Sequence, residues 1–289
     1  MALGGNPVFK GNRNFRNPQS YQGQQRTPGY PGYAGSATPT VGQQTQLSGQ
    51  QLQDLYNAPS AGPVQTGRMT YDDVIVKTLG TLALVLGGAA VGWIFPILIL
   101  PGMLVGLVLG LVNSFKREPS PALIMAYAVA EGMFLGGLSA VLEGLYPGIV
   151  VQAVIGSLSV FAVTLLLFKS GKVRATPKMT RFFLIALGGY FVFSLINFGL
   201  MAFNVTNSPW GIRSMDIPGT NIPFGVVLGL LAVGLASFAL IMDFTSIQRG
   251  VENGVPARYA WTAAFGLTVT LVWLYVEILR LLAILRGND

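Results

Sequence analysis

Three carboxylic acids stand inside long apolar stretches of this 289-residue chain, namely Glu131, Asp243 and Glu277. A charged side chain at the middle of a membrane costs about 2.5–3.5 kcal/mol on insertion scales, so such acids face the protein interior and find a partner or a proton. Two acids that share a site take up protons as a coupled unit, and their ionised oxygens suit Ca²⁺ as ligands. These residues therefore predict proton-linked or cation-linked chemistry within a membrane.

Each acid also has a purely structural interpretation. Glu277 is explained equally by a local ion pair with Arg280, which follows three residues later on the same helix. In the structural interpretation of Asp243, the carboxylate lies at the inner membrane surface and is capped by Arg249 or by water. Glu131 is explained as a hydrogen-bonding group between helices. One such acid is weak evidence for a site, but three on different helices favour one.

Histidine and cysteine are both absent from the sequence. Without histidine the chain has no Ser–His couple and no HExxH zinc site, and without cysteine it has no disulfide or thiol nucleophile. We therefore expect no enzyme and no cofactor. Carboxylates, Lys, Arg, Tyr and Ser then remain to carry any chemistry.

The composition places the chain in a membrane. Hydrophobic residues make up 52% and charged residues 10% of the sequence, and the mean hydropathy is +0.57. Soluble domains carry about 25% charged residues, and about 20 apolar residues cross a bilayer. The apolar stretches cover residues 74–93, 97–112, 121–142, 149–168, 182–203, 223–243 and 260–285. The sequence predicts an all-α membrane protein, a bundle of seven transmembrane helices, whose sixth helix has no breaker before Gly250.

Residues 1–66 have a different composition, rich in Gln, Gly, Pro, Asn and Ser. They lack the periodic apolar positions whose burial offsets the entropy lost on ordering. We expect a disordered, basic cytoplasmic tail here, followed by a transmembrane domain over residues 70–287. Thr70 and Asp73 have the spacing of a capping box, so the first helix is expected to begin beside Thr70.

The basic residues orient the predicted bundle. With the N-terminus inside, 15 of the 18 Lys and Arg residues fall in the tail and in the loops on the inner side. Cytoplasmic loops of membrane proteins are rich in these residues. The net charge of +7 is then explained by topology rather than by nucleic acid. We expect a multi-pass protein of the plasma or inner membrane, with a cytoplasmic N-terminus, an outside C-terminus and the lipid bilayer as its partner.

Four segments carry a family resemblance. FALIMDFTSI contains Asp243, LYVEILRLLAIL contains Glu277 and Arg280, AEGMFLGGLS contains Glu131, and SLINFG contains Asn197. They resemble motifs of the Bax inhibitor-1 family, the transmembrane Bax inhibitor motif proteins, in a bacterial branch with a long N-terminal tail. The resemblance covers about residues 70–287.

The resemblance implies a seven-helix bundle whose last helix is wrapped by the others, and a pH-sensitive leak for Ca²⁺ or another cation. The alternative hypothesis is a membrane-embedded regulator that binds partner proteins and uses the acids structurally. In the family, paired acids on the sixth and seventh helices act as the sensor, and these positions match Asp243 and Glu277, which would bind the cation. A basic residue at the inner end of the second span joins that network, a place that Lys116 or Arg117 occupies here. Asn197 is expected to join this polar network, and its structural interpretation is a hydrogen bond between two helices.

The sequence departs from the family pattern in two ways. The acid of the seventh helix is commonly Asp, whereas Glu277 is longer. Asp243 and Glu277 are also 34 residues apart. If both helices turn near residues 250–257, these acids lie roughly 10 Å and 30 Å deep, at about 1.5 Å per residue. Pairing then requires interfacial or re-entrant structure within 251–265, and simple depth counting favours Glu131 as the neighbour of Asp243.

Overall fold

The computed structural model describes residues 67–287 except 204, 207 and 209. The predicted tail, residues 1–66, lies outside this part of the chain. The described residues contain seven helices long and apolar enough to cross a membrane, which confirms the predicted fold class. The helices are α5 (Tyr71–Ile94), α6 (Ile99–Phe115), α7 (Pro121–Leu145), α8 (Ile149–Lys169), α9 (Pro177–Ala202), α10 (Phe224–Glu252) and α11 (Ala260–Arg286). Single 3₁₀ turns, η2 (Pro96–Leu98), η3 (Gly211–Ser214) and η4 (Ala257–Tyr259), precede α6, α10 and α11.

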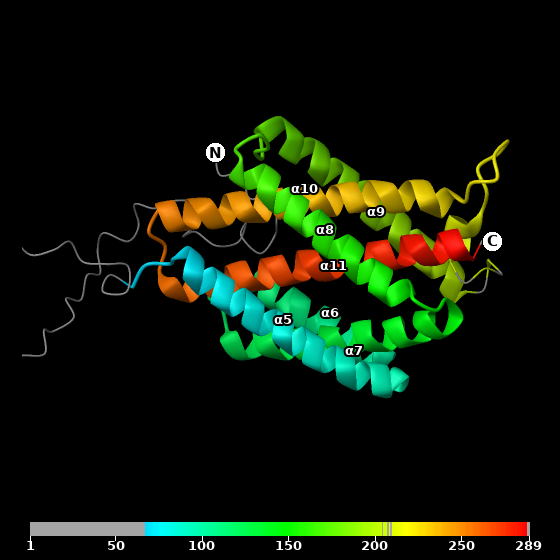
Figure 1. Cartoon of the computed structure of the whole chain (residues 1–289), viewed down its shortest axis with the longest axis horizontal. Coiled ribbons are helices and arrows are strands. Elements are labelled where there is room, and N and C mark those ends of the chain that lie inside the picture. The colour runs from blue at the N-terminus through cyan, green and yellow to red at the C-terminus, as the bar shows by residue number, and fades with distance from the viewer. Residues whose placement is uncertain (1–66, 204, 207, 209, 288–289) are drawn as a thin grey trace, which may run out of the picture.

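Helix α11 forms the centre of the bundle. It runs along the middle of the molecule, with α5, α6 and α7 on one side and α10 on the other (Figure 1). In its most apolar stretch of 18 residues, 56% is buried inside the protein. The corresponding share for α9 is 17%. Its first turns carry Ala260, Ala263 and Ala264, all fully buried, and such small side chains let neighbouring helices approach closely. The wrapped last helix that the resemblance implied is therefore present.

Glycines determine how α5 packs against α7. Gly88 and Gly92 on α5 lie against Gly132 and Gly136 on α7, and a Cβ atom at any of them would overlap backbone atoms of the opposite helix. The two backbones therefore pack in direct contact, as in other helix pairs with small residues four apart. The sequence analysis did not single out these four glycines.

Glycines of α6 also pack against α7. A Cβ atom at Gly102 would lie 2.8 Å from the carbonyl oxygen of Ala130, and one at Gly106 would collide with the carboxylate of Glu131. Glycine at these positions thus lets α6 approach α7 and gives the Glu131 side chain its space.

The helix ends partly follow the predictions. The capping box at the start of α5 is present, since Asp73 N donates to Thr70 Oγ1 and Thr70 N donates to Asp73 Oδ2, both at 3.1 Å. Helix α9 begins at Pro177 rather than at residue 182. Its first turn has proline, which needs no hydrogen bond there, and Thr176 accepts from Met179 N as the cap.

Helix α10 continues well past Asp243 and ends at Glu252, as the missing breaker indicated. Only a tight turn and η4 separate it from α11. The residues before α5 lie along this turn, where Met69 N donates to Val255 O at 2.7 Å and Ala257 N donates to Gly67 O at 2.8 Å. Residues 251–265 therefore contain no re-entrant segment of the kind that would bring the two predicted acids to one depth.

Candidate functional site

A buried charged cluster surrounds Glu277 on α11, which is only 2% exposed. Its Oε1 accepts hydrogen bonds from the Tyr190 hydroxyl at 2.6 Å and from Trp273 Nε1 at 3.2 Å. Arg280 Nη1 donates to both carboxylate oxygens, at 3.0 and 3.1 Å. The local Glu277–Arg280 pair considered in the sequence analysis is thus present, although it is one part of a larger network.

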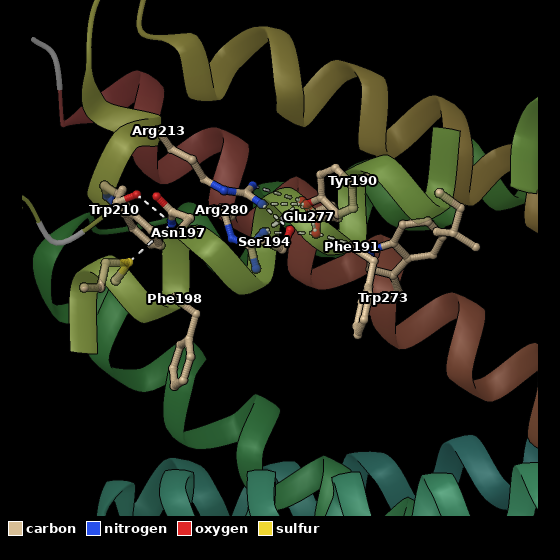
Figure 2. A pocket seen from close by; sticks show the side chains of 12 residues that line it. Tyr190, Phe191, Ser194, Asn197, Phe198, Trp210, Arg213, Trp273, Glu277 and Arg280 are labelled. Carbon is tan, nitrogen blue, oxygen red and sulfur yellow. Dashed lines mark hydrogen bonds and ion pairs between the residues drawn. The ribbon is translucent and has the colours of Figure 1, made fainter. Parts of the chain in front are cut away.

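Arg213 completes the cluster from a loop. Its Nη1 lies 3.9 Å from Glu277 Oε2, and its Nη2 donates to the hydroxyls of Tyr190 and Ser194, both at 3.0 Å. Figure 2 shows the Arg213, Arg280 and Tyr190 side chains converging on Glu277 from η3, α11 and α9. The cluster therefore joins α9 and the following η3 loop to α11, which lies much later in the sequence.

Asn197 on α9 holds the loop that carries Arg213. Its Nδ2 donates to Trp210 O at 3.2 Å, and its Oδ1 accepts from Ile212 N at 2.8 Å. Gly211, between these two residues, has a φ of +62° and lies against the Asn197 side chain, so a larger residue would be strained and would lack space. Asn197 thus supports the polar network indirectly, by fixing the loop.

A cavity of about 450 Å³ lies between α9, η3 and α11, with the charged cluster at its wall (Figure 2). Its polar lining consists of Tyr190, Ser194, Asn197, Arg213, Glu277 and Arg280. Aromatic side chains, among them Phe191, Phe198, Trp210 and Trp273, form much of the remaining lining. The cavity therefore combines an apolar wall with two guanidinium groups.

Asp243 lies elsewhere, at the interface of α10 and α11. It is 0% exposed, and its Oδ2 accepts from Thr270 Oγ1 at 2.6 Å. Thr270 precedes Glu277 by seven residues, about 10 Å along the helix axis. The structure thus gives the two acids different partners at successive levels of α11, and their action as one titrating pair stays a prediction. Complete burial is inconsistent with the alternative in which Asp243 is exposed to solvent at the inner membrane surface.

Three further predicted site residues, Glu131, Lys116 and Arg117, lie apart from both acids. Glu131 faces Gly106 of α6, whereas Asp243 lies between α10 and α11. The structure therefore does not support the expectation, based on depth in the membrane, that Glu131 is the neighbour of Asp243. Lys116 and Arg117 are exposed at the end of α6. Neither is among the partners of Glu277, whose basic neighbours are Arg213 and Arg280.

Several members of the cluster were missed at the sequence level. Tyr190, Ser194 and Trp273 resemble ordinary residues of apolar helices, and Arg213 lies in a loop outside the apolar stretches. One signal was available, because Trp273, Glu277 and Arg280 are spaced to share a helix face.

The surroundings of Asp243 and Glu277 differ in how well they would suit a Ca²⁺ ion. Within the described residues, no three acidic side chains lie close enough together to hold a metal ion. The oxygens of Glu277 already accept from Arg280 and lie beside Arg213, and both cations oppose a further positive charge. Asp243 and the Thr270 hydroxyl are oxygen donors of the type that Ca²⁺ prefers.

Seven membrane-spanning helices in the described residues, of which the last is the most buried, with acids inside the bundle, define a multi-pass membrane protein. A family model described as Bax inhibitor 1 like matches residues 6–287, and the chain belongs to this family. The match extends toward the N-terminus beyond residues 70–287, to which the recognised motifs were confined. A search of curated proteins found no match.

Proposed function

We propose that the protein is a pH-sensitive cation leak of the membrane, with Ca²⁺ as the transported ion, and that it acts without catalysis. The observation that carries this proposal is the complete burial of Asp243 between α10 and α11, beside the Thr270 hydroxyl. A buried carboxylate is stable only when a proton, a cation or hydrogen-bond donors compensate its charge. Asp243 is therefore the position at which a proton and a passing cation compete.

Other oxygen donors support a route along α11. Thr262, Thr268 and Thr270 are all buried on this helix, and Thr268 Oγ1 lies 2.8 Å from Thr81 Oγ1 of α5. Hydroxyl and carbonyl oxygens suit a hard cation. Conduction also requires binding weak enough for the ion to leave, and a single carboxylate with neighbouring hydroxyls meets that requirement.

The cluster at Glu277 acts as the gate in this proposal. Arg213 and Arg280 present two positive charges about two helical turns beyond Asp243, and they oppose a cation that follows the α10–α11 interface. The same residues tie the η3 loop and α9 to α11. Passage of a cation therefore requires this cluster to rearrange, which couples flux to the position of α9 and of the loop.

We further propose that the N-terminus is cytoplasmic and the C-terminus outside. The turns α6–α7, α8–α9 and α10–α11 lie at the same end of the bundle as the start of α5 (Figure 1). Together with the helix ends beside them, these turns carry nine of the 14 Lys and Arg residues in the described part of the chain. This segregation supports the orientation, because cytoplasmic loops are rich in Lys and Arg. The cluster at Glu277 then lies toward the outer end.

Purified protein in liposomes with an enclosed Ca²⁺ indicator tests the proposal. Flux is expected to rise with pH as Asp243 gives up its proton, and Asp243→Asn, which preserves size and polarity, is expected to remove most of this pH dependence. Glu252→Gln is the matched control, because Glu252 is an exposed acid on the same helix. Wild-type liposomes impermeable to Ca²⁺ at every pH would contradict the leak and leave the alternative, a membrane regulator that acts by binding partner proteins.

A further inference from the structure

The charged cluster beside the cavity contains two cations and one anion. Arg213 and Arg280 both contact Glu277, and no other acid forms an ion pair with either arginine among the described residues. Arg213 is only 3% exposed and Glu277 only 2%, whereas the Arg280 side chain is 26% exposed, so the excess positive charge lies on the arginine that is partly open at the cavity wall. A partly buried positive charge of this kind is expected to attract an anion.

The arginines also have unused hydrogen-bond donors. Arg213 Nη1 is buried and has no hydrogen-bond acceptor in the described part of the chain, since 3.9 Å to Glu277 Oε2 is too long for one. Arg280 uses Nη1 for Glu277 and Tyr190, while its Nη2 and Nε have no acceptor among residues 67–287 as described. An unsatisfied guanidinium donor is costly when buried, and carboxylates and phosphates are the groups that match its geometry.

The remainder of the cavity suits an apolar chain. The lining residues Phe191 and Phe198 are 60% and 62% exposed on α9, on the surface that the bilayer would cover. A volume of about 450 Å³ accommodates a head group and the first part of a chain. Glu277 also lies only nine residues before the end of α11, about 14 Å along its axis, so a lipid head group needs to move only a short distance inward.

We propose that this cavity binds the anionic head group of an amphiphile, a carboxylate or phosphate on an apolar chain, through Arg213 and Arg280. The excess charge and the unused donors recognise the anion, and the aromatic wall receives the chain. Bound there, the amphiphile contacts α9, η3 and α11 together and holds the cluster closed. Binding requires no ion flux, so this inference stands or falls separately from the cation leak.

Quenching of tryptophan fluorescence tests the proposal directly, because Trp210 and Trp273 line the cavity. The full chain in uncharged detergent is titrated with a dibrominated fatty acid, whose bromines quench tryptophan on contact. We expect saturable quenching that weakens in Trp273→Phe, and competition by phosphatidylglycerol but not by inorganic phosphate. Equal competition by inorganic phosphate would contradict the binding of an amphiphile and indicate a simple anion site.

Arg280→Gln supplies the decisive variant. It leaves Arg213 and Glu277 balanced in charge, so the protein is expected to fold, while its affinity for the brominated fatty acid falls at least tenfold. Arg286→Gln is the control, since Arg286 is on the same helix but bonds Pro147 O outside the cavity. The fatty acid is also expected to raise the unfolding temperature of the wild type but not that of Arg280→Gln. Unsaturable quenching, or equal affinity in the wild type and Arg280→Gln, would overturn the proposal.

Discussion

Arg213 Nη1 and Glu277 Oε2 lie 3.9 Å apart in the interior of the bundle, although Arg213 belongs to a loop and Glu277 to the central helix. Both side chains are almost fully buried. The loop between α9 and α10 therefore enters the bundle rather than merely connecting two spans. This contact places a loop residue in the wall of the cavity and links the loop to the helix that the other spans surround.

Removing one partner of this buried pair is expected to destabilise the protein strongly. Glu277→Ala leaves two buried arginines without their counter-charge, and loss of one partner of a buried pair costs about 3–5 kcal/mol. At about 2–4 °C per kcal/mol, the unfolding temperature in detergent should fall by roughly 6–20 °C. Glu118→Ala is the control, because Glu118 forms an exposed pair with Arg258 that is worth about 0–1 kcal/mol. Equal shifts for the two variants would argue against a buried network.

Asn197→Ala should release the η3 loop. The substitution leaves Ile212 N without its acceptor and Trp210 O without its donor, a loss of about 1–3 kcal/mol. Peptides covering residues 210–216 should then exchange amide hydrogens faster, while those of α5 and α7 remain unchanged. Asn197→Asp keeps the acceptor for Ile212 N and should restore part of the protection. Unchanged exchange in Asn197→Ala would mean that other contacts hold the loop.

The contact of α5 with α7 should be sensitive to a single methyl group. Gly136→Ala places a Cβ atom against the backbone of Ala89, and overpacking of this kind costs about 1–3 kcal/mol. Gly87→Ala is the matched control, because a Cβ atom at Gly87 meets nothing within 4 Å. Thermal unfolding in detergent should show a loss of stability for Gly136→Ala alone. Similar unfolding temperatures for Gly136→Ala and Gly87→Ala would indicate that α5 and α7 can move apart without losing stability.

The proposed orientation can be tested with reporter fusions. A fusion after Gly171, in the basic turn between α8 and α9, should report the cytoplasm, and one at the chain end, Asp289, should report the outside. The expectation follows from the segregation of Lys and Arg. Reporters on the same side would contradict the proposed arrangement of seven spans.

The sequence predicts the elements of this fold better than it predicts their contacts. Seven apolar stretches are long enough to cross a bilayer, and membrane helices satisfy their own backbone hydrogen bonds, so length and composition suffice. The start of α9 was misplaced because Lys178 and Arg181 suggested a loop, although Thr176 and Pro177 have the sequence signature of a helix start.

The candidate site was only partly predictable for a different reason. Glu277 and its pair with Arg280 follow from spacing on one helix, and burial of Asp243 follows from its place in an apolar stretch. The position of Arg213 depends on hydrogen bonds between Asn197 and the backbone of Trp210 and Ile212. Such long-range loop geometry leaves no periodic pattern in the sequence.

Ca²⁺ flux into liposomes, measured across a pH series for Asp243→Asn, Glu277→Gln and the double variant, tests the central claim most directly. Because the acids have separate partners, we expect Asp243→Asn to remove most of the pH dependence. Glu277→Gln is expected to change the amount of flux while keeping its pH dependence, and the double variant should combine both effects. Identical profiles for all three variants would instead indicate one shared titrating pair. A wild-type pH profile in Asp243→Asn would contradict the account.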